Sequence, residues 1–152
     1  MRINFIMSTF ASMRIFILLS LVLMSFSFTS TTPADKIVGV WLSQIKDGNI
    51  QIFKKNGKYH GKIIWIKEPN DKNGQPICDD HNPVGSLKSR RILNLVIIKD
   101  LVYADGEWSG GTVYDPKEGK TYDCKIWMEG QNLKLRGYLG WFYDTKTWTR
   151  IK

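Results

Sequence analysis

The sequence predicts an all-β protein built as a single antiparallel barrel of about eight strands. Short runs that alternate apolar and polar residues are separated by Gly, Asn and Asp, and no long apolar pattern with helical spacing follows the first 28 residues. The short links between these runs favour an antiparallel barrel or a two-sheet sandwich. Because a closed barrel leaves no exposed edge strands, the barrel is the preferred prediction and the sandwich is the alternative.

Residues 1–28 are predicted to be a cleaved secretory signal peptide. Arg2 and Arg14 precede an uncharged apolar run over residues 15–28, which is the order of regions in a signal peptide. A helix of about 14 residues rises only about 21 Å, whereas the bilayer core is about 30 Å thick; a membrane anchor is the alternative. We therefore expect a secreted or periplasmic protein that is not stably inserted in a membrane after cleavage. The remaining chain is divided into a short linker, residues 29–36, and one domain, residues 37–152.

The first three strands are expected at residues 37–43, 50–54 and 59–66. Asn56-Gly57, between the second and third strands, is the strongest short hairpin signal because both residues tolerate the positive φ of a type I′ turn. The alternation then stops, and residues 67–90 contain three prolines, which lack the amide donor that a strand needs. Loops longer than about 12–15 residues are often lids or binding loops. Residues 67–90 are therefore predicted to cover a site.

The second half of the chain supplies the other strands. They are expected at residues 92–102 (one long strand or two bent ones), 108–114, 121–129, 133–138 and 146–151. Alternation in residues 121–129 places Cys124 and Ile126 on the dry face and Trp127 on the wet face. One dry and one wet face are expected of an antiparallel sheet that covers a core on one side.

Residues near the two ends of the predicted domain suggest how the barrel closes. Gly39 and Trp41 in the first strand, with Arg150 in the last, form the combination that closes lipocalin-type barrels. A guanidinium that lies on an indole contributes about 0.5–2 kcal/mol, and the first and last strands of an up-and-down barrel are neighbours. The alternative is that Trp41 is an ordinary core residue and Arg150 an unrelated surface residue.

The chain contains two cysteines, Cys78 in the long loop and Cys124 in a strand. Two cysteines in an exported protein favour a disulfide. This bond would tie the loop to the barrel wall and stabilise the fold by about 2–4 kcal/mol. Two free thiols, with Cys124 as a small core residue, are the alternative.

Composition and motifs argue against several functional classes. The net charge is +8, but the basic residues are scattered and form no stripe, so nucleic acid is not an expected partner. Gly119-Lys120-Thr121 is similar to the end of a phosphate-binding loop, yet Tyr114 stands where that motif needs its first glycine. The only histidines, His60 and His81, belong to no nucleophilic motif. No catalytic residue is assigned, and an enzyme is the less favoured class.

The densest polar cluster is Asp79-Asp80-His81, followed by Asn82-Pro83. Adjacent residues on an extended segment point in different directions, and no second ligand group stands out, so neither a metal site nor another cofactor is predicted. Asn-Pro after Asp is typical of a turn. Arg90 and Arg91, further along the loop, have guanidinium groups that suit a carboxylate or phosphate; pairing with neighbouring carboxylates or solvent is the alternative.

Several motifs, taken in order, resemble those of the bacterial exported family known as domain of unknown function 2147. They are residues 78–83 (CDDHNP), 90–95 (RRILNL), 108–116 (WSGGTVYDP), 119–122 (GKTY), 133–140 (LKLRGYLG) and 148–150 (WTR). The resemblance extends from about residue 35 to residue 152. It implies export, a single small lipocalin-like barrel and no assigned reaction. The sequence departs from the family at Asn94, where glycine is usual, and at Val84, where Asp is frequent.

The leading functional hypothesis is that the barrel binds a small apolar or amphipathic ligand in its mouth, beneath residues 67–90. The residues assigned to ligand binding are Asn82, Arg90, Arg91, Tyr114 and Arg136. The alternative is a module that binds an envelope component or another protein through a surface aromatic patch around Trp127 and Trp141. In either case a monomer is expected.

Overall fold

The computed structural model describes residues 32–151. The predicted signal peptide, residues 1–28, lies outside the described residues. Among residues 32–151, no helix is long and apolar enough to cross a membrane.

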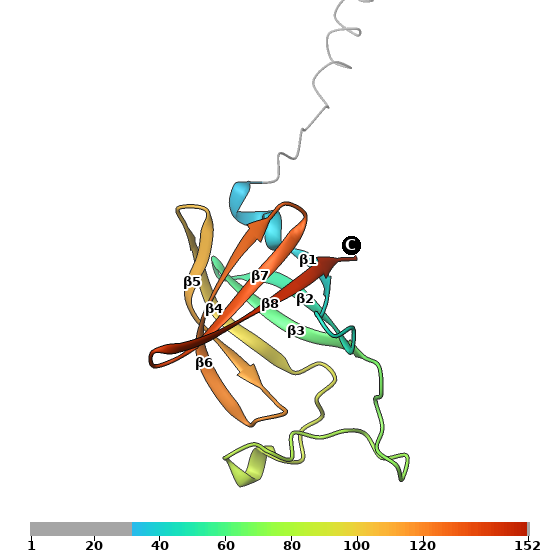
Figure 1. The fold of residues 1–152 in the computed structure, drawn as a ribbon. Coiled ribbons are helices and arrows are strands. Elements are labelled where there is room, and N and C mark those ends of the chain that lie inside the picture. The colour runs from blue at the N-terminus through green and yellow to red at the C-terminus, as the bar shows by residue number, and fades with distance from the viewer. Residues whose placement is uncertain (1–31, 152) are drawn as a thin grey trace, which may run out of the picture. The chain divides into compact units, whose positions relative to one another are not determined.

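The described chain forms a closed barrel of eight antiparallel strands in sequence order (Figure 1). The strands are β1 (Gly39–Leu42), β2 (Gly48–Lys55), β3 (Lys58–Ile66), β4 (Val96–Ala104), β5 (Glu107–Asp115), β6 (Lys120–Glu129), β7 (Asn132–Leu139) and β8 (Phe142–Arg150). Two short 3-10 helices, η1 (Pro33–Ile37) and η2 (Gly85–Leu87), accompany them. The predicted eight-stranded antiparallel barrel is confirmed, and the two-sheet alternative is excluded.

Alternation assigned the faces of the strands correctly. Cys124 and Ile126 of β6 are buried inside the barrel, and Leu133 and Leu135 of β7 face the same interior. Trp127 lies on the outer face, where the Nζ of Lys125 is 5.4 Å from the centre of its ring. The core therefore consists of the inward-facing residues of each strand, as expected for an antiparallel barrel.

Three element boundaries differ from the prediction by more than two residues. Residues 33–37, expected to be linker and the start of a strand, form η1, with Pro33 in the first turn, where its missing N–H costs nothing. β4 begins at Val96 and not at residue 92, because Asn94 has φ +70 and Leu95 N–H donates to Ile92 O in a turn. β8 begins at Phe142 and not at residue 146, because it continues the β7 hairpin, in which Leu139 pairs with Phe142.

One end of the barrel is closed by η1. The indole N–H of Trp41 donates to Ile37 O at 2.8 Å, and that of Trp108 donates to Ala34 O at 2.9 Å. The Tyr59 hydroxyl donates to Asp35 Oδ1 at 2.7 Å. This hydrogen bond, with those from Lys54 and Thr32, lowers the pKa of Asp35 to about 2. Three strands are thus tied to η1, and their large side chains fill this end.

The seam between β1 and β8 is short. It contains two residue pairs, Trp41 with Arg150 and Leu42 with Thr149. The guanidinium carbon of Arg150 lies 4.2 Å from the centre of the Trp41 ring, and its Nη1 donates to Val38 O at 3.0 Å. Gly39, at the start of β1, has φ +143, a backbone region that L side chains rarely adopt. The tryptophan and the arginine singled out in the sequence therefore meet at the seam, and Gly39, two residues before Trp41, pairs with Ile52 of β2.

Candidate functional site

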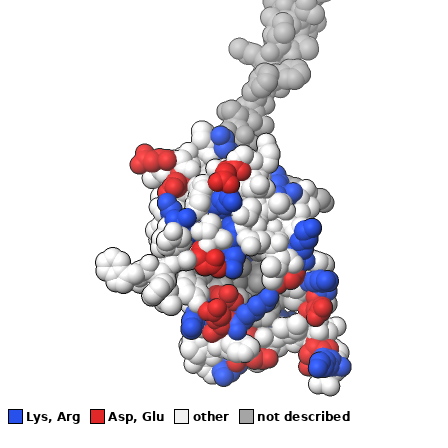
Figure 2. Space-filling view, in the orientation of Figure 1, with Lys and Arg blue, Asp and Glu red and all other residues white. Residues whose placement is uncertain are grey.

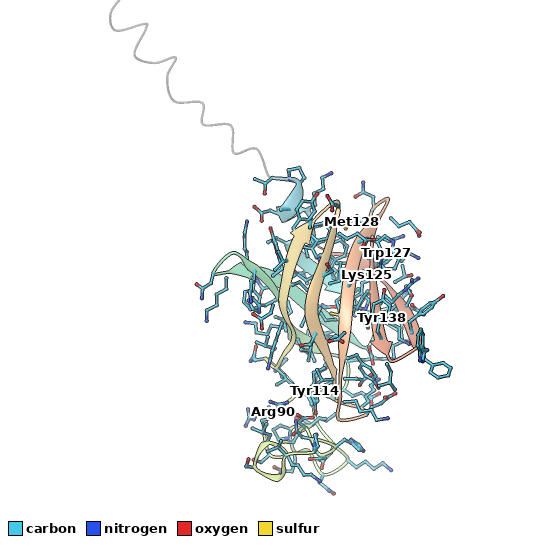
Figure 3. The ribbon with its side chains drawn as sticks, turned by 90° about the vertical axis from the view of Figure 1, so that its left-hand side faces the viewer. Arg90, Tyr114, Lys125, Trp127, Met128 and Tyr138 are labelled. Atoms are coloured by element: carbon cyan, nitrogen blue, oxygen red, sulfur yellow. The ribbon has the colours of Figure 1, made fainter. Side chains whose placement is uncertain are left out.

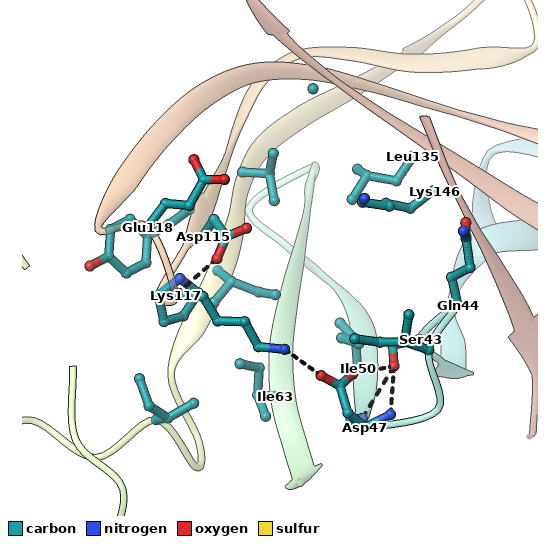
Figure 4. Close-up of a pocket in the computed structure, with 18 of the residues that line it drawn as sticks. Ser43, Gln44, Asp47, Ile50, Ile63, Asp115, Lys117, Glu118, Leu135 and Lys146 are labelled. Atoms are coloured by element: carbon teal, nitrogen blue, oxygen red, sulfur yellow. Dashed lines mark hydrogen bonds and ion pairs between the residues drawn. The ribbon is translucent and has the colours of Figure 1, made fainter. Parts of the chain in front are cut away.

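The end of the barrel opposite η1 holds an open cavity of about 1070 Å³ (Figure 4). Its inner walls are largely apolar, and Trp148 from β8 takes part in them. The apolar lining includes Ile50 of β2, Ile63 of β3, Ile97 of β4, Val113 of β5 and Leu135 of β7. These residues face inward because each occupies an inward position of its strand. The cavity is therefore the unfilled half of the barrel core.

The rim of the cavity is polar and includes an ion pair between two turns. Lys117, in the β5–β6 turn, places its Nζ 2.7 Å from Asp47 Oδ2 in the β1–β2 turn (Figure 4). The Ser43 hydroxyl donates to the other oxygen of Asp47 at 2.7 Å. Burial alone would raise the pKa of Asp47, but the bonds from Lys117 and Ser43 outweigh it and lower the pKa. A polar, internally paired rim thus borders an apolar interior.

A second ion pair lies on the cavity wall itself. Lys146 and Asp144 are on inward positions of β8, and their Nζ and Oδ2 atoms are 2.5 Å apart. The hydrogen bond from Lys146 lowers the pKa of Asp144. Lys146 pairs in register with Leu135 of β7. The polar head of an amphipathic molecule would find both signs of charge here, beside an apolar wall.

The β3–β4 loop, residues 67–95, is anchored through one buried carboxylate, Asp79, which is 0% exposed. The Tyr114 hydroxyl donates to Asp79 Oδ1 at 2.6 Å. Asn82 Nδ2 and Arg90 Nε each donate to Oδ2 at 2.8 Å. Arg90 also places a terminal nitrogen 2.7 Å from the same oxygen. Burial favours a higher pKa for Asp79, yet these bonds outweigh it, so the pKa is lowered and the carboxylate is charged.

This network attaches the loop to the barrel wall. Asp79, Asn82 and Arg90 belong to the loop, whereas Tyr114 belongs to β5; Figure 3 shows Arg90 and Tyr114 at the junction of the two. The Arg90 guanidinium also lies 5.3 Å from the centre of the Tyr114 ring. Ile77 and Ile92 of the loop line the cavity. The loop therefore forms a fixed part of the cavity wall and does not hang free.

The loop makes a second attachment at Gly119, in the β5–β6 turn. A Cβ at this position would lie 1.9 Å from His81 O, and Gly119 has φ +67. We expect Gly119→Ala to lower the free energy of unfolding by about 2–4 kcal/mol, from left-handed backbone strain and a forced displacement of the loop. Urea unfolding, followed by tryptophan fluorescence, measures this change in the free energy of unfolding.

The control is Gly130→Ala. Gly130 has φ +59 with nothing within 4 Å of a Cβ, so it carries the backbone penalty alone, about 1–2 kcal/mol. Equal losses in the two variants would show that the approach to His81 is unimportant.

The residues assigned to ligand binding from the sequence are placed differently by the structure. Of the five, Tyr114 lines the cavity. Asn82 and Arg90 are engaged by Asp79, so their polar groups hold the loop. Arg91 is exposed and pairs with Cys78 in an isolated bridge. Arg136 lies on the outer face of β7, 4.2 Å from the Tyr143 ring, and is absent from the cavity lining.

The predicted disulfide is wrong, because Cys78 and Cys124 are both free thiols. Cys124 is buried inside β6, and this burial raises its pKa to about 12. Cys78 points along its own loop, where its thiol donates to Pro76 O at 3.4 Å. The loop is held to the wall by hydrogen bonds to Asp79 instead.

The aromatic patch proposed around Trp127 and Trp141 consists of two separate environments. Trp127 is half-buried on the outer face of β6, covered by Lys125 and Arg136 (Figure 3). Trp141 is at the tip of the β7–β8 hairpin.

Within residues 32–151, no group of three or more Asp, Glu, His or Cys side chains lies close enough together to hold a metal ion.

Comparisons with known proteins agree with this architecture. The sequence model of the family DUF2147, described as "Uncharacterized protein conserved in bacteria", matches residues 39–150. A solved structure, described as protein HP1028 from the human pathogen Helicobacter pylori and as belonging to the lipocalin family, is 25% identical, with a TM-score of 0.64. That similarity covers 76% of this chain and 83% of the other. No curated protein matches the chain. The match over most of the chain shows that this protein, a lipocalin-like barrel, belongs to the DUF2147 family.

Proposed function

We propose that this protein binds a small apolar or amphipathic molecule in the open half of its barrel. The observation that carries the proposal is the cavity of about 1070 Å³, walled by aliphatic side chains and open to solvent. Pockets for small molecules are concave and mostly apolar, with a few polar groups that orient the ligand. An apolar surface of this kind gains free energy when a ligand displaces water from it.

The arrangement of polar groups favours a ligand with one polar end. Its apolar part would lie against Ile50, Ile63 and Leu135, deep in the barrel. Its polar part would lie near the Asp47–Lys117 pair at the rim or the Asp144–Lys146 pair on the wall. The β3–β4 loop would contribute a wall through Ile77 and Ile92.

A substitution that fills the cavity tests this function. Val113 lines the cavity, and Val113→Phe adds bulk to its interior. We expect the Kd for N-phenyl-1-naphthylamine, a neutral apolar fluorescent probe, to rise about tenfold, a loss of about 1.4 kcal/mol. The matched control is Val102→Phe on β4, where Val102 is 48% exposed and absent from the cavity lining. A wild-type protein that does not bind the probe, or equal binding by both variants, would overturn the proposal.

Native mass spectrometry of protein purified from its own cells identifies the ligand. The predicted export would place that ligand in the periplasm or the medium. Cell fractionation with N-terminal sequencing of the purified protein tests this location and the cleavage position together.

A further inference from the structure

The most exposed large apolar side chains of the described chain gather at the cavity mouth. They are Trp141 (99% exposed), Phe142 (79%), Ile45 (69%), Tyr143 (62%) and Leu139 (57%). Apart from Trp141, each of them also lines the cavity. Exposed apolar groups scattered singly are ordinary, but a cluster such as the four on one hairpin, residues 139 and 141–143, marks an interaction site. This set continues the apolar surface of the cavity out to solvent.

Four of the five residues belong to the hairpin between β7 and β8, which projects from the barrel and forms the uncharged protrusion in Figure 2. Leu139 and Phe142 face each other across the turn, and Gly140 has φ +58. The fifth, Ile45, lies in the turn between β1 and β2. The two turns border the mouth from different strands.

The barrel wall is open between these two turns. β8 pairs with β1 only at Thr149 and Arg150, and Thr147 N–H donates to the side chain of Gln44 at 2.8 Å. In the part of the chain that the structure describes, the first residues of β8, from Phe142 to Lys146, have no strand partner on the β1 side. Gln44, Tyr143 and Lys146 all line the cavity. The cavity therefore opens sideways, directly beside the exposed hairpin.

We propose that this mouth docks on a phospholipid bilayer, with the tip of the β7–β8 hairpin inserted among the headgroups. The inference rests on the proposed ligand-binding function and names the source of the ligand. An amphipathic molecule passes between the bilayer and the cavity through the lateral opening, without crossing water. The class of ligand is therefore a bilayer-derived amphipath.

The chemistry of the hairpin fits a bilayer. Tryptophan and tyrosine have an apolar body with a polar tip, which suits the boundary between acyl chains and headgroups. Arg136 lies next to the hairpin, 4.2 Å from the Tyr143 ring and 5.1 Å from the Trp127 ring, with its Nε donating to Thr145 Oγ1 at 2.8 Å. Within residues 32–151, no carboxylate forms an ion pair with it. A guanidinium held in this way matches the geometry of a lipid phosphate.

A bilayer explains the position of these residues better than a second copy of the chain. The apolar side chains of the hairpin and Ile45 border an opening that leads into the cavity, so a protein partner seated on them would block this part of the mouth. A bilayer covers the same side chains and leaves a path for the ligand.

Trp141→Asp tests the docking. The charged side chain opposes insertion, while a Gly-Asp turn suits a two-residue hairpin, so the fold is retained. Trp141 does not line the cavity, so binding of N-phenyl-1-naphthylamine without vesicles should stay within twofold of wild type. The assay is flotation with vesicles of phosphatidylethanolamine and phosphatidylglycerol. We expect the vesicle-bound fraction to fall at least fivefold and the vesicle-induced blue shift of tryptophan emission to decrease.

The matched control is Trp65→Ala on β3, where Trp65 is 43% exposed and absent from the cavity lining. Wild type and variants are purified from their own cells and have the same N-terminus. Any contribution of the N-terminal residues to vesicle binding is therefore the same for all of them. Equal flotation of Trp141→Asp and wild type would overturn the docking, as would a wild-type protein that does not float. A dimer in light scattering that Trp141→Asp dissolves would assign the hairpin to a second copy. Flotation without probe binding would instead reject the ligand-binding function and the exchange of ligand.

Discussion

Replacing Asp79 with alanine is expected to lower the free energy of unfolding by about 3–5 kcal/mol. The substitution removes the acceptor for three side chains at once, and the cationic Arg90 loses its only ion-pair partner among residues 32–151. The buried Asn82 amide, one of these three, keeps only the Tyr114 hydroxyl as acceptor, at 3.0 Å from its Nδ2. A buried donor without a partner costs about 1–3 kcal/mol. The β3–β4 loop should detach from β5, and probe binding should weaken with it.

Urea unfolding at pH 7 measures this loss. Asp80→Ala is the control, because Asp80 is the exposed neighbour of Asp79 and such surface changes remain within about 0.5 kcal/mol. An Asp79→Ala protein as stable as this control would contradict the structural role of the network.

The same network predicts a dependence on pH. The pKa of Asp79 is lower in the folded protein than its ordinary value of 3.8, so the unfolded chain binds the proton first as the pH falls. The stabilisation is complete above about pH 4 and is lost as the pH falls through the folded-state pKa. The difference in stability between wild type and Asp79→Asn should therefore shrink below about pH 4. A constant difference from pH 7 to pH 2 would exclude a charged Asp79.

Trp41→Ala is expected to cost about 3–5 kcal/mol, at the closed end of the barrel. Trp41 is 0% exposed, donates to Ile37 O and lies beneath the guanidinium of Arg150. The substitution leaves a cavity in the packed half of the core, frees η1 and removes the ring that holds the last strand. Thermal unfolding monitored by circular dichroism should show a large decrease in Tm.

Trp65→Ala again provides the comparison, because it removes the same side chain from a partly exposed position on β3. Its loss should be far smaller than that of Trp41→Ala. Similar values for the two would mean that Trp41 is not central to closure of the barrel.

The strands could be predicted because their signals are local. Asn56 and Gly57 have φ +51 and +76, as a tight hairpin turn requires, and they join β2 to β3 as expected. Asn94, at a position where the family resemblance leads one to expect glycine, has φ +70, which asparagine tolerates better than most residues. Alternation also separated the inner from the outer face of β6 and β7.

The site could not be predicted in the same way, because its residues come together only through the fold. Asp79 and Tyr114 are 35 positions apart, and no local pattern shows that they meet. Arg90 and Asn82 were therefore interpreted as ligand-binding groups, although they hold the loop. Alternation placed Ile126 on the dry face, yet it could not show which end of the barrel η1 fills. The cavity lies at the end that η1 leaves open, so its position could not be predicted either.

The short β1–β8 seam has a consequence for how the molecule assembles. Apart from the β1–β8 pair, all neighbouring strands of the barrel are consecutive in the sequence. Most of the wall therefore forms by successive hairpins. The β1–β8 seam, in contrast, joins distant parts of the chain, since Arg150 contacts Val38 across 112 positions. Loop-closure entropy opposes the formation of this seam, and only two residue pairs stabilise it. We therefore expect ring closure to be the last event of folding and the first to reverse. In hydrogen–deuterium exchange, the amides of the β1–β8 seam should exchange first. Transient separation of β1 and β8 would widen the lateral opening of the cavity while the rest of the sheet stays intact.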